Sequence, residues 1–171
     1  MKLNRPFLLV LALALLVSGS ALAAGTATYA ATNLPQTIPS SAATWAPDVT
    51  VPVDTAVCGG SDVVLDIDAH VNITHTWAGD LIISISHSGG ASSDLVHRVG
   101  RVGGAGFGDS SDYAGDYSFN DAFTGDLWAA AAGAGGGDPI PGGDYFATGE
   151  GSDVQISLLD VFGGIDISGT W

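Results

Sequence analysis

The charge of this 171-residue chain sets the first limit on its function. Eighteen acidic residues oppose four basic ones, a formal net charge of −14, and a surface this acidic disfavours binding to nucleic acids or to anionic lipid. The 25 glycines and seven prolines stay below the roughly 25–30% that is typical of low-complexity chains, so we expect a packed globular domain.

The amino terminus has the pattern of a secretory signal peptide. Lys2 and Arg5 precede an apolar run over residues 7–17, and small residues follow up to Ala23. The run has about half of the roughly 20 apolar residues that a membrane span needs. We therefore expect residues 1–23 to be a signal peptide and the mature chain to be secreted, periplasmic or held at the cell surface.

The next segment, residues 24–44, is polar, rich in small residues and interrupted by proline, and is expected to be a flexible leader. Cys58 is the single cysteine of the chain, so no disulfide can form within it. A buried thiol and an intermolecular partner both remain open for Cys58.

Alternating apolar residues predict the strands. Val49, Val51 and Val53 indicate an edge strand that includes Pro52. The clearest alternation covers residues 63–74, and "LIISISHS" and "DLVHRV" continue it as a hairpin-like meander. Two further strands are predicted in "DVQISLLDVF" and "DISGTW". The pattern indicates an all-β, two-sheet sandwich over residues 45–171.

Residues 103–151 interrupt this pattern. They are rich in glycine, aspartate and alanine and are predicted to form a long acidic insertion. One short helix is expected there, at about residues 123–132.

Four motifs in chain order give the chain a family resemblance. "VNITHTWAGDLIISIS" resembles the signature of the P domain, or Homo B domain, which follows the catalytic domain in proprotein convertases and in secreted bacterial subtilisin-like proteases. "YSFNDAF", "LLDVFGG" and "SGTW" are similar to later elements of that family. The residues that carry the signature are His75, Thr76, Trp77, Gly79, Asp80, Gly169, Thr170 and Trp171.

The resemblance implies a jelly-roll sandwich of the galactose-binding-like type, without catalysis of its own, that stabilises a subtilisin-like serine endopeptidase and so supports proteolysis. Two departures are visible. Residues 86–90 replace the usual Ser-Pro-x-Gly-Thr, which puts the turn geometry in doubt. The family continues past Gly-Thr-Trp with two more strands, so we expect a C-terminally incomplete sandwich with an unpaired edge that depends on a partner or is marginally stable.

Calcium is the cofactor that the acidic loops suggest. In the family reading, Asp80, Asn120 and Asp121 approach each other and could supply hard oxygen ligands, with Asp109, Asp112 and Asp116 in reserve. The alternative is that these acids are solvated loop charges.

Two rival functions use other residues. A free-standing carbohydrate- or surface-binding jelly roll would use Trp128 and Tyr145 as exposed stacking groups. A hydrolase would use Ser110 in "GDSSD", but no catalytic triad is visible in the sequence, so enzyme activity is left open.

The four histidines do not show the close spacing of a zinc site. His70 and His75 are expected on opposite faces of one strand. His75 is predicted to be a hydrogen-bonded corner residue, with Thr76 capping the turn, Trp77 covering the edge of the core and Gly79 providing conformational freedom.

Overall fold

The computed structural model describes residues 25–32, 34–35, 37–38, 50–51, 63–104 and 106–171. The expected signal peptide, part of the leader (residues 24, 33, 36 and 39–44) and Cys58 lie outside these residues. Among the residues described, no helix is long and apolar enough to cross a membrane.

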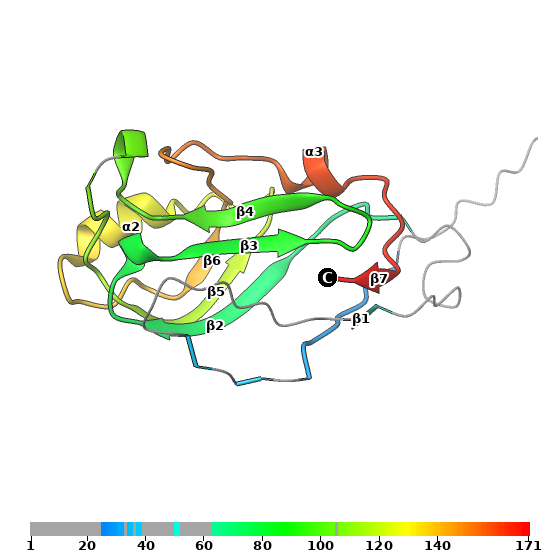
Figure 1. Cartoon of the computed structure of the whole chain (residues 1–171), viewed down its shortest axis with the longest axis horizontal. Coiled ribbons are helices and arrows are strands. Elements are labelled where there is room, and N and C mark those ends of the chain that lie inside the picture. Colours follow the sequence, from blue (N-terminus) through cyan, green and yellow to red (C-terminus); the bar gives the residue numbers. More distant parts are fainter. Residues whose placement is uncertain (1–24, 33, 36, 39–49, 52–62, 105) are drawn as a thin grey trace, which may run out of the picture.

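The described chain is β-rich, as predicted, and its strands form three small sheets. β2 (Ala69–His75), β5 (Tyr113–Phe119) and β6 (Gly143–Tyr145) form the first. β3 (Ile82–Ser86) pairs with β4 (Ser92–His97), and β1 (Thr50–Val51) pairs with β7 (Gly169–Thr170). Figure 1 shows β3 and β4 running along the molecule, with α2 near one end and the β1–β7 pair at the other.

The core is built around β5. Tyr113, Tyr117 and Phe119 alternate along this strand and are almost fully buried. On the neighbouring β2, Val71 and Ile73 face the core, whereas the polar residues between them are exposed. Burial of each large side chain contributes about 1.5–3 kcal/mol, so the three aromatic residues of β5 stabilise the fold.

The meander prediction is correct only for β3 and β4, which pair as an antiparallel hairpin. β2 pairs in antiparallel register with β5, and the chain between β2 and β3 crosses from one sheet to another. The crossing includes a short 3₁₀ helix, η1 (Ala78–Asp80). The amides of Ala78 and Gly79 in this helix donate to the carbonyls of Ser111 and Asp109. The two strands that η1 connects do not pair with each other, so it is not the turn of a hairpin.

The strand predicted over residues 63–74 begins only at Ala69. The alternation predicts Leu65 on the apolar face with Val63 and Ile67, but Leu65 is 65% exposed and Val64 is buried instead. The amide of Val64 donates to the carbonyl of Ile165, and its own carbonyl accepts from Gly164. This first part of the segment therefore pairs with the C-terminal region and does not extend β2.

The region 103–151 is not the weakly patterned loop that we expected. It opens with a second 3₁₀ helix, η2 (Val102–Gly104), and contains β5, the helix α2 (Leu127–Ala134) and β6. The predicted short helix is confirmed, but it starts later because the Asp126 carboxylate accepts hydrogen bonds from the amides of Trp128 and Ala129, at 2.9 and 3.0 Å.

The strand predicted in "DVQISLLDVF" is wrong. Its second half is the helix α3 (Leu158–Phe162). The hydroxyl of Ser157 caps this helix by accepting from the amide of Asp160, and the amide of Gly163 closes its end on the carbonyl of Leu159. The apolar residues that suggested a strand bury one side of the helix through Leu158 and Phe162.

Candidate functional site: the His75–Asp80 corner

The N-terminal signature forms the corner between β2 and β3. The Nδ1 atom of His75, the last residue of β2, accepts a hydrogen bond from the amide of Trp77 at 3.2 Å. The indole Nε1 of Trp77 donates to the carbonyl of Phe107 at 3.1 Å. Thr76 is exposed, and no side-chain cap of η1 is present, so the predicted cap by Thr76 is wrong. His75 is the hydrogen-bonded corner residue that the sequence indicates.

Gly79 lets two backbone segments touch. A Cβ atom at this position would lie 2.5 Å from the carbonyl oxygen of Phe107 and 2.6 Å from the Cα of Gly108. The Gly79 amide donates to the carbonyl of Asp109, and the amide of the fully buried Ala78 donates to that of Ser111. The glycine is needed for space, and any side chain would force the segments apart.

Arg98 holds the corner from the β4 side. Its Nε donates to the carbonyl of Gly79 at 2.9 Å, and its Nη2 lies 3.8 Å from the Asp80 carboxylate. The Asp80 side chain is 55% exposed, so this ion pair adds little stability, about 0–1 kcal/mol. Arg98 has a positive φ of 47°, an uncommon backbone conformation for a residue with a side chain.

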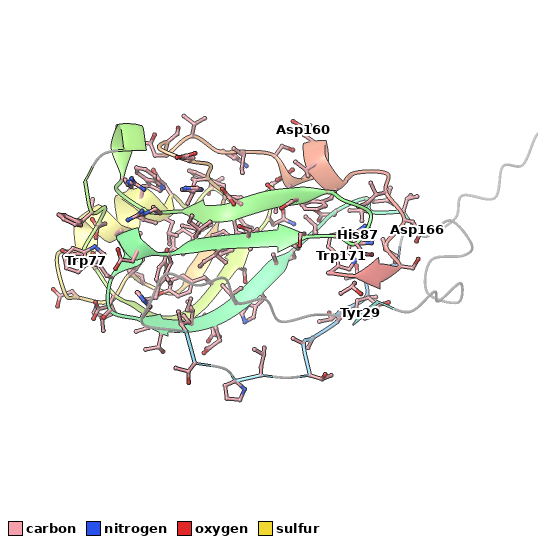
Figure 2. All side chains as sticks on the ribbon, viewed as in Figure 1. Tyr29, Trp77, His87, Asp160, Asp166 and Trp171 are labelled. Carbon is pink, nitrogen blue, oxygen red and sulfur yellow. The ribbon has the colours of Figure 1, made fainter. Side chains whose placement is uncertain are left out.

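Two aromatic rings point outward at this corner. Trp77 is 38% exposed, and Phe107 is 79% exposed. Figure 2 places Trp77 at one end of the molecule. The corner therefore presents an apolar surface on a tightly bonded backbone.

The C-terminal signature lies at the other end, where Figure 2 labels Trp171 beside His87. Gly169 and Thr170 form β7, and Ser88 exchanges two hydrogen bonds with Thr170. The ring of Trp171 contacts those of His87 and Phe162, with centroids 4.6 and 5.4 Å apart.

The turn whose geometry the sequence left in doubt is well bonded. The Nε2 of His87 lies 2.9 Å from the carbonyl of Ser168, and its Nδ1 accepts from the amide of Gly89. His87 thus connects the β3–β4 turn to β7.

The structure does not bring the three expected calcium ligands together. Asp80 ends η1, which follows the His75 end of β2, and His75 pairs with Tyr113. Asn120 follows the opposite end of β5, where Phe119 pairs with Ala69. A seven-residue strand is about 20 Å long, so about this distance separates Asp80 from Asn120 and Asp121.

Asn120 and Asp121 already bind protein groups. Asn120 donates to the Asp66 carboxylate and the Ile67 carbonyl, and its side-chain oxygen accepts from the amide of Ala122. The Asp121 carboxylate accepts from the amides of Leu158 and Leu159 at 2.7 and 3.0 Å and from the hydroxyl of Ser157 at 2.7 Å.

These contacts change the acidity of Asp121. Burial acts to raise the pKa of its carboxyl, but the hydrogen bonds from Leu159, Leu158 and Ser157 outweigh it and hold the pKa below its usual value. The carboxylate stabilises the start of α3. Asp109, a reserve ligand, accepts from the amide and the hydroxyl of Ser111. Within the described ranges, no group of three or more His, Cys, Asp or Glu residues could hold a metal ion.

The residues of the rival functions are not placed as those functions require. Tyr145 is 7% exposed, and its hydroxyl donates to the carbonyl of Pro141. Trp128 is partly buried, with its Nε1 donating to Thr148. The prediction of exposed stacking groups is wrong for Tyr145, and Trp128 is only partly exposed. For Ser110, no described histidine bonds its hydroxyl.

The prediction that His70 and His75 lie on opposite faces of one strand is confirmed, since His70 is on the exposed face of β2 and His75 is on the other face. Sequence reasoning missed the roles of Phe107 and Arg98 at the corner. No sequence signal could have found them, because each depends on contacts between distant segments.

Comparison with protein-family models, with curated proteins and with solved structures gives no match to this chain.

Proposed function

We propose that this chain is a secreted, non-catalytic module of the P-domain type that stabilises a subtilisin-like serine endopeptidase. The strands would belong to a jelly-roll-like sandwich. The sequence resemblance suggests the family, and the observation that carries the functional proposal is the outward-facing pair Trp77 and Phe107 on the corner.

Three features of the corner support a docking role. Its polar backbone groups are bonded within the chain, so apolar contact with a partner would leave few of them unsatisfied. The backbone contact at Gly79 fixes the position of the rings, which lowers the entropy cost of binding. Exposed tryptophan and phenylalanine are also among the residues enriched at protein interfaces.

The test joins the mature chain to the C-terminus of a subtilisin-like catalytic domain that inactivates rapidly on its own. We expect the fusion to lengthen the half-life of peptidase activity on heating and Phe107→Ser to remove most of this gain. Phe107 is suited to the test because its side chain is 79% exposed, so its loss should leave the fold intact.

The matched control is Leu65→Ala, another exposed apolar residue, outside the corner. It should keep the gain in half-life. The proposal would be refuted if the fusion lost peptidase activity on heating as fast as the catalytic domain alone. Peptidase activity of the isolated chain would also refute it. Retention on a polysaccharide resin that Phe107→Ser abolishes would favour the carbohydrate-binding alternative.

A further inference from the structure

The strand β3 has an open edge. Among the described residues, β3 pairs only with β4, so no described strand lies along its other side. Three of its five residues, Ile82, Ser84 and Ser86, are exposed. A row of exposed backbone donors and acceptors of this kind is a template for pairing with another strand.

The backbone groups of alternate residues point toward this edge. Just beyond the two ends of β3, the carbonyl of Leu81 accepts from the amide of Arg98, and the amide of His87 donates to the carbonyl of Ala91. These odd-numbered residues therefore bond toward β4. In an antiparallel pair every second residue does so, which leaves the amides and carbonyls of the even-numbered residues of β3 facing the open edge.

The sequence of β3 does not guard this edge. IISIS contains no charged residue and no proline, the two residue types that most often prevent edge pairing. The acidic residue of the hairpin, Asp94, lies on β4, where it accepts from the hydroxyl of Ser84 at 2.7 Å and lies 2.7 Å from the Nδ1 of His97. In a chain with a net charge of −14, two copies can approach here with less repulsion than at an acidic surface.

The strand is also complementary to itself. In an antiparallel pairing of two copies centred on Ser84, Ile83 lies opposite Ile85 of the other copy, and Ile82 lies opposite Ser86. Ile83 and Ile85 pack against the core, so their pairing extends the apolar face of the hairpin. A shift of one residue would turn the isoleucines of one copy to the solvent face, which favours this register.

We propose that two copies of this chain pair in antiparallel fashion through β3 and form one continuous sheet in the order β4–β3–β3–β4. Each outward-facing residue of one copy exchanges two backbone hydrogen bonds with the residue opposite. Because the strand has five residues, the contact is small and the dimer is weak and reversible. The contact does not use Trp77 or Phe107, so it is independent of the proposed protease partner.

The experiment is sedimentation equilibrium of the tag-free protein at concentrations up to about 1 mM, together with NMR of the backbone amides on dilution. We expect the mean mass to rise toward that of two chains, with the largest amide shifts at Ile82, Ser84 and Ser86. Added NaCl should strengthen the association, because it screens the repulsion between two acidic copies. Ser84→Pro removes an amide that faces the open edge and should weaken the association by at least about tenfold.

Ser92→Pro is the matched control. Ser92 is exposed and follows Ala91, which bonds toward β3, so its own amide points away from β3. This variant should associate as the native chain does, and circular dichroism checks that both proline variants keep the fold.

The proposal fails if the native protein stays monomeric up to about 1 mM, or if Ser84→Pro associates as tightly as the native chain. It also fails if Phe107→Ser abolishes the association, because the corner would then be the contact. The dilution shifts of the native chain locate the contact without any variant, and shifts that avoid β3 would overturn the proposal.

Discussion

The two ends of the β2–β5 strand pair are held by different kinds of contact. At the His75 end, backbone packs on backbone around Gly79 and Gly108. At the Ala69 end, the side chains of Asn120 and Asp121 bond to the segments that precede β2 and begin α3. The first end should be sensitive to added volume at Gly79, and the second should be sensitive to pH through the depressed pKa of Asp121.

The largest effect is expected from Gly79→Ala. Its new methyl group would meet the backbone of residues 107–109, which cannot rotate away as a side chain could. We expect a loss of about 3 kcal/mol or more in the free energy of unfolding, measured by urea denaturation. The control, Gly133→Ala within α2, meets nothing within 4 Å and should raise stability by about 0.5–1 kcal/mol. Equal stability of the two variants would show that the close approach at Gly79 does not exist.

Asp121→Asn should produce the next largest effect. It replaces a carboxylate that accepts three hydrogen bonds and should cost about 1.5–3 kcal/mol near neutral pH. Because the folded pKa is depressed, the native carboxylate contributes stability above its unfolded pKa of about 3.9 and loses it as pH falls through the folded value. Denaturation at a series of pH values should show that the free energy of unfolding falls less steeply below pH 4 in the variant than in the native chain. The difference should correspond to the uptake of about one proton. The same pH dependence of stability in Asp121→Asn and in the native chain would contradict the role of Asp121 in stabilising the start of α3.

Two tyrosines of β5 should differ when each loses its hydroxyl. The hydroxyl of Tyr117 donates to the carbonyl of Ile140 and accepts from the amide of Ala114, so Tyr117→Phe should cost about 1–2 kcal/mol. The buried hydroxyl of Tyr113 has no hydrogen-bond partner among the described groups, and burial raises its pKa far above the usual value. Tyr113→Phe should be neutral or stabilise by up to about 1 kcal/mol, and a loss as large as that of Tyr117→Phe would show that this hydroxyl is bonded.

Calcium should have the smallest effect. Asp80 is one strand length from Asn120 and Asp121, and both of the latter are engaged with protein groups. Melting curves recorded with calcium and with a chelator should therefore coincide. A higher melting temperature in calcium that Asp80→Asn and Asp121→Asn both abolish would show that the two ends come together.

Local patterns predicted the parts of the fold that are governed by neighbours in the chain. Alternation identified β2, β3 and β4, and the small residues after Asp126 indicated α2. The capping group of α3, Ser157 with Asp160 three residues later, was also visible, but the run of apolar residues favoured a strand. β5 was missed because Gly115 and Asp116 are poor strand formers, although its buried aromatic residues do alternate.

The site was less predictable because it depends on distant contacts. The sequence indicated that His75, Trp77 and Gly79 form a corner. It gave no sign that the corner packs on residues 107–109, thirty positions along the chain. Similarly, Asp80 and Asp121 could be grouped as calcium ligands only until the register of β2 with β5 was known.

The central claim is that the corner is a rigid support for Trp77 and Phe107, and amide hydrogen exchange tests it most directly. The amides of Ala78, Gly79 and Asp109 donate to the carbonyls of Ser111, Asp109 and Val99. We predict that they exchange as slowly as the amides between β2 and β5. Exchange as fast as that of an open surface loop would contradict the claim.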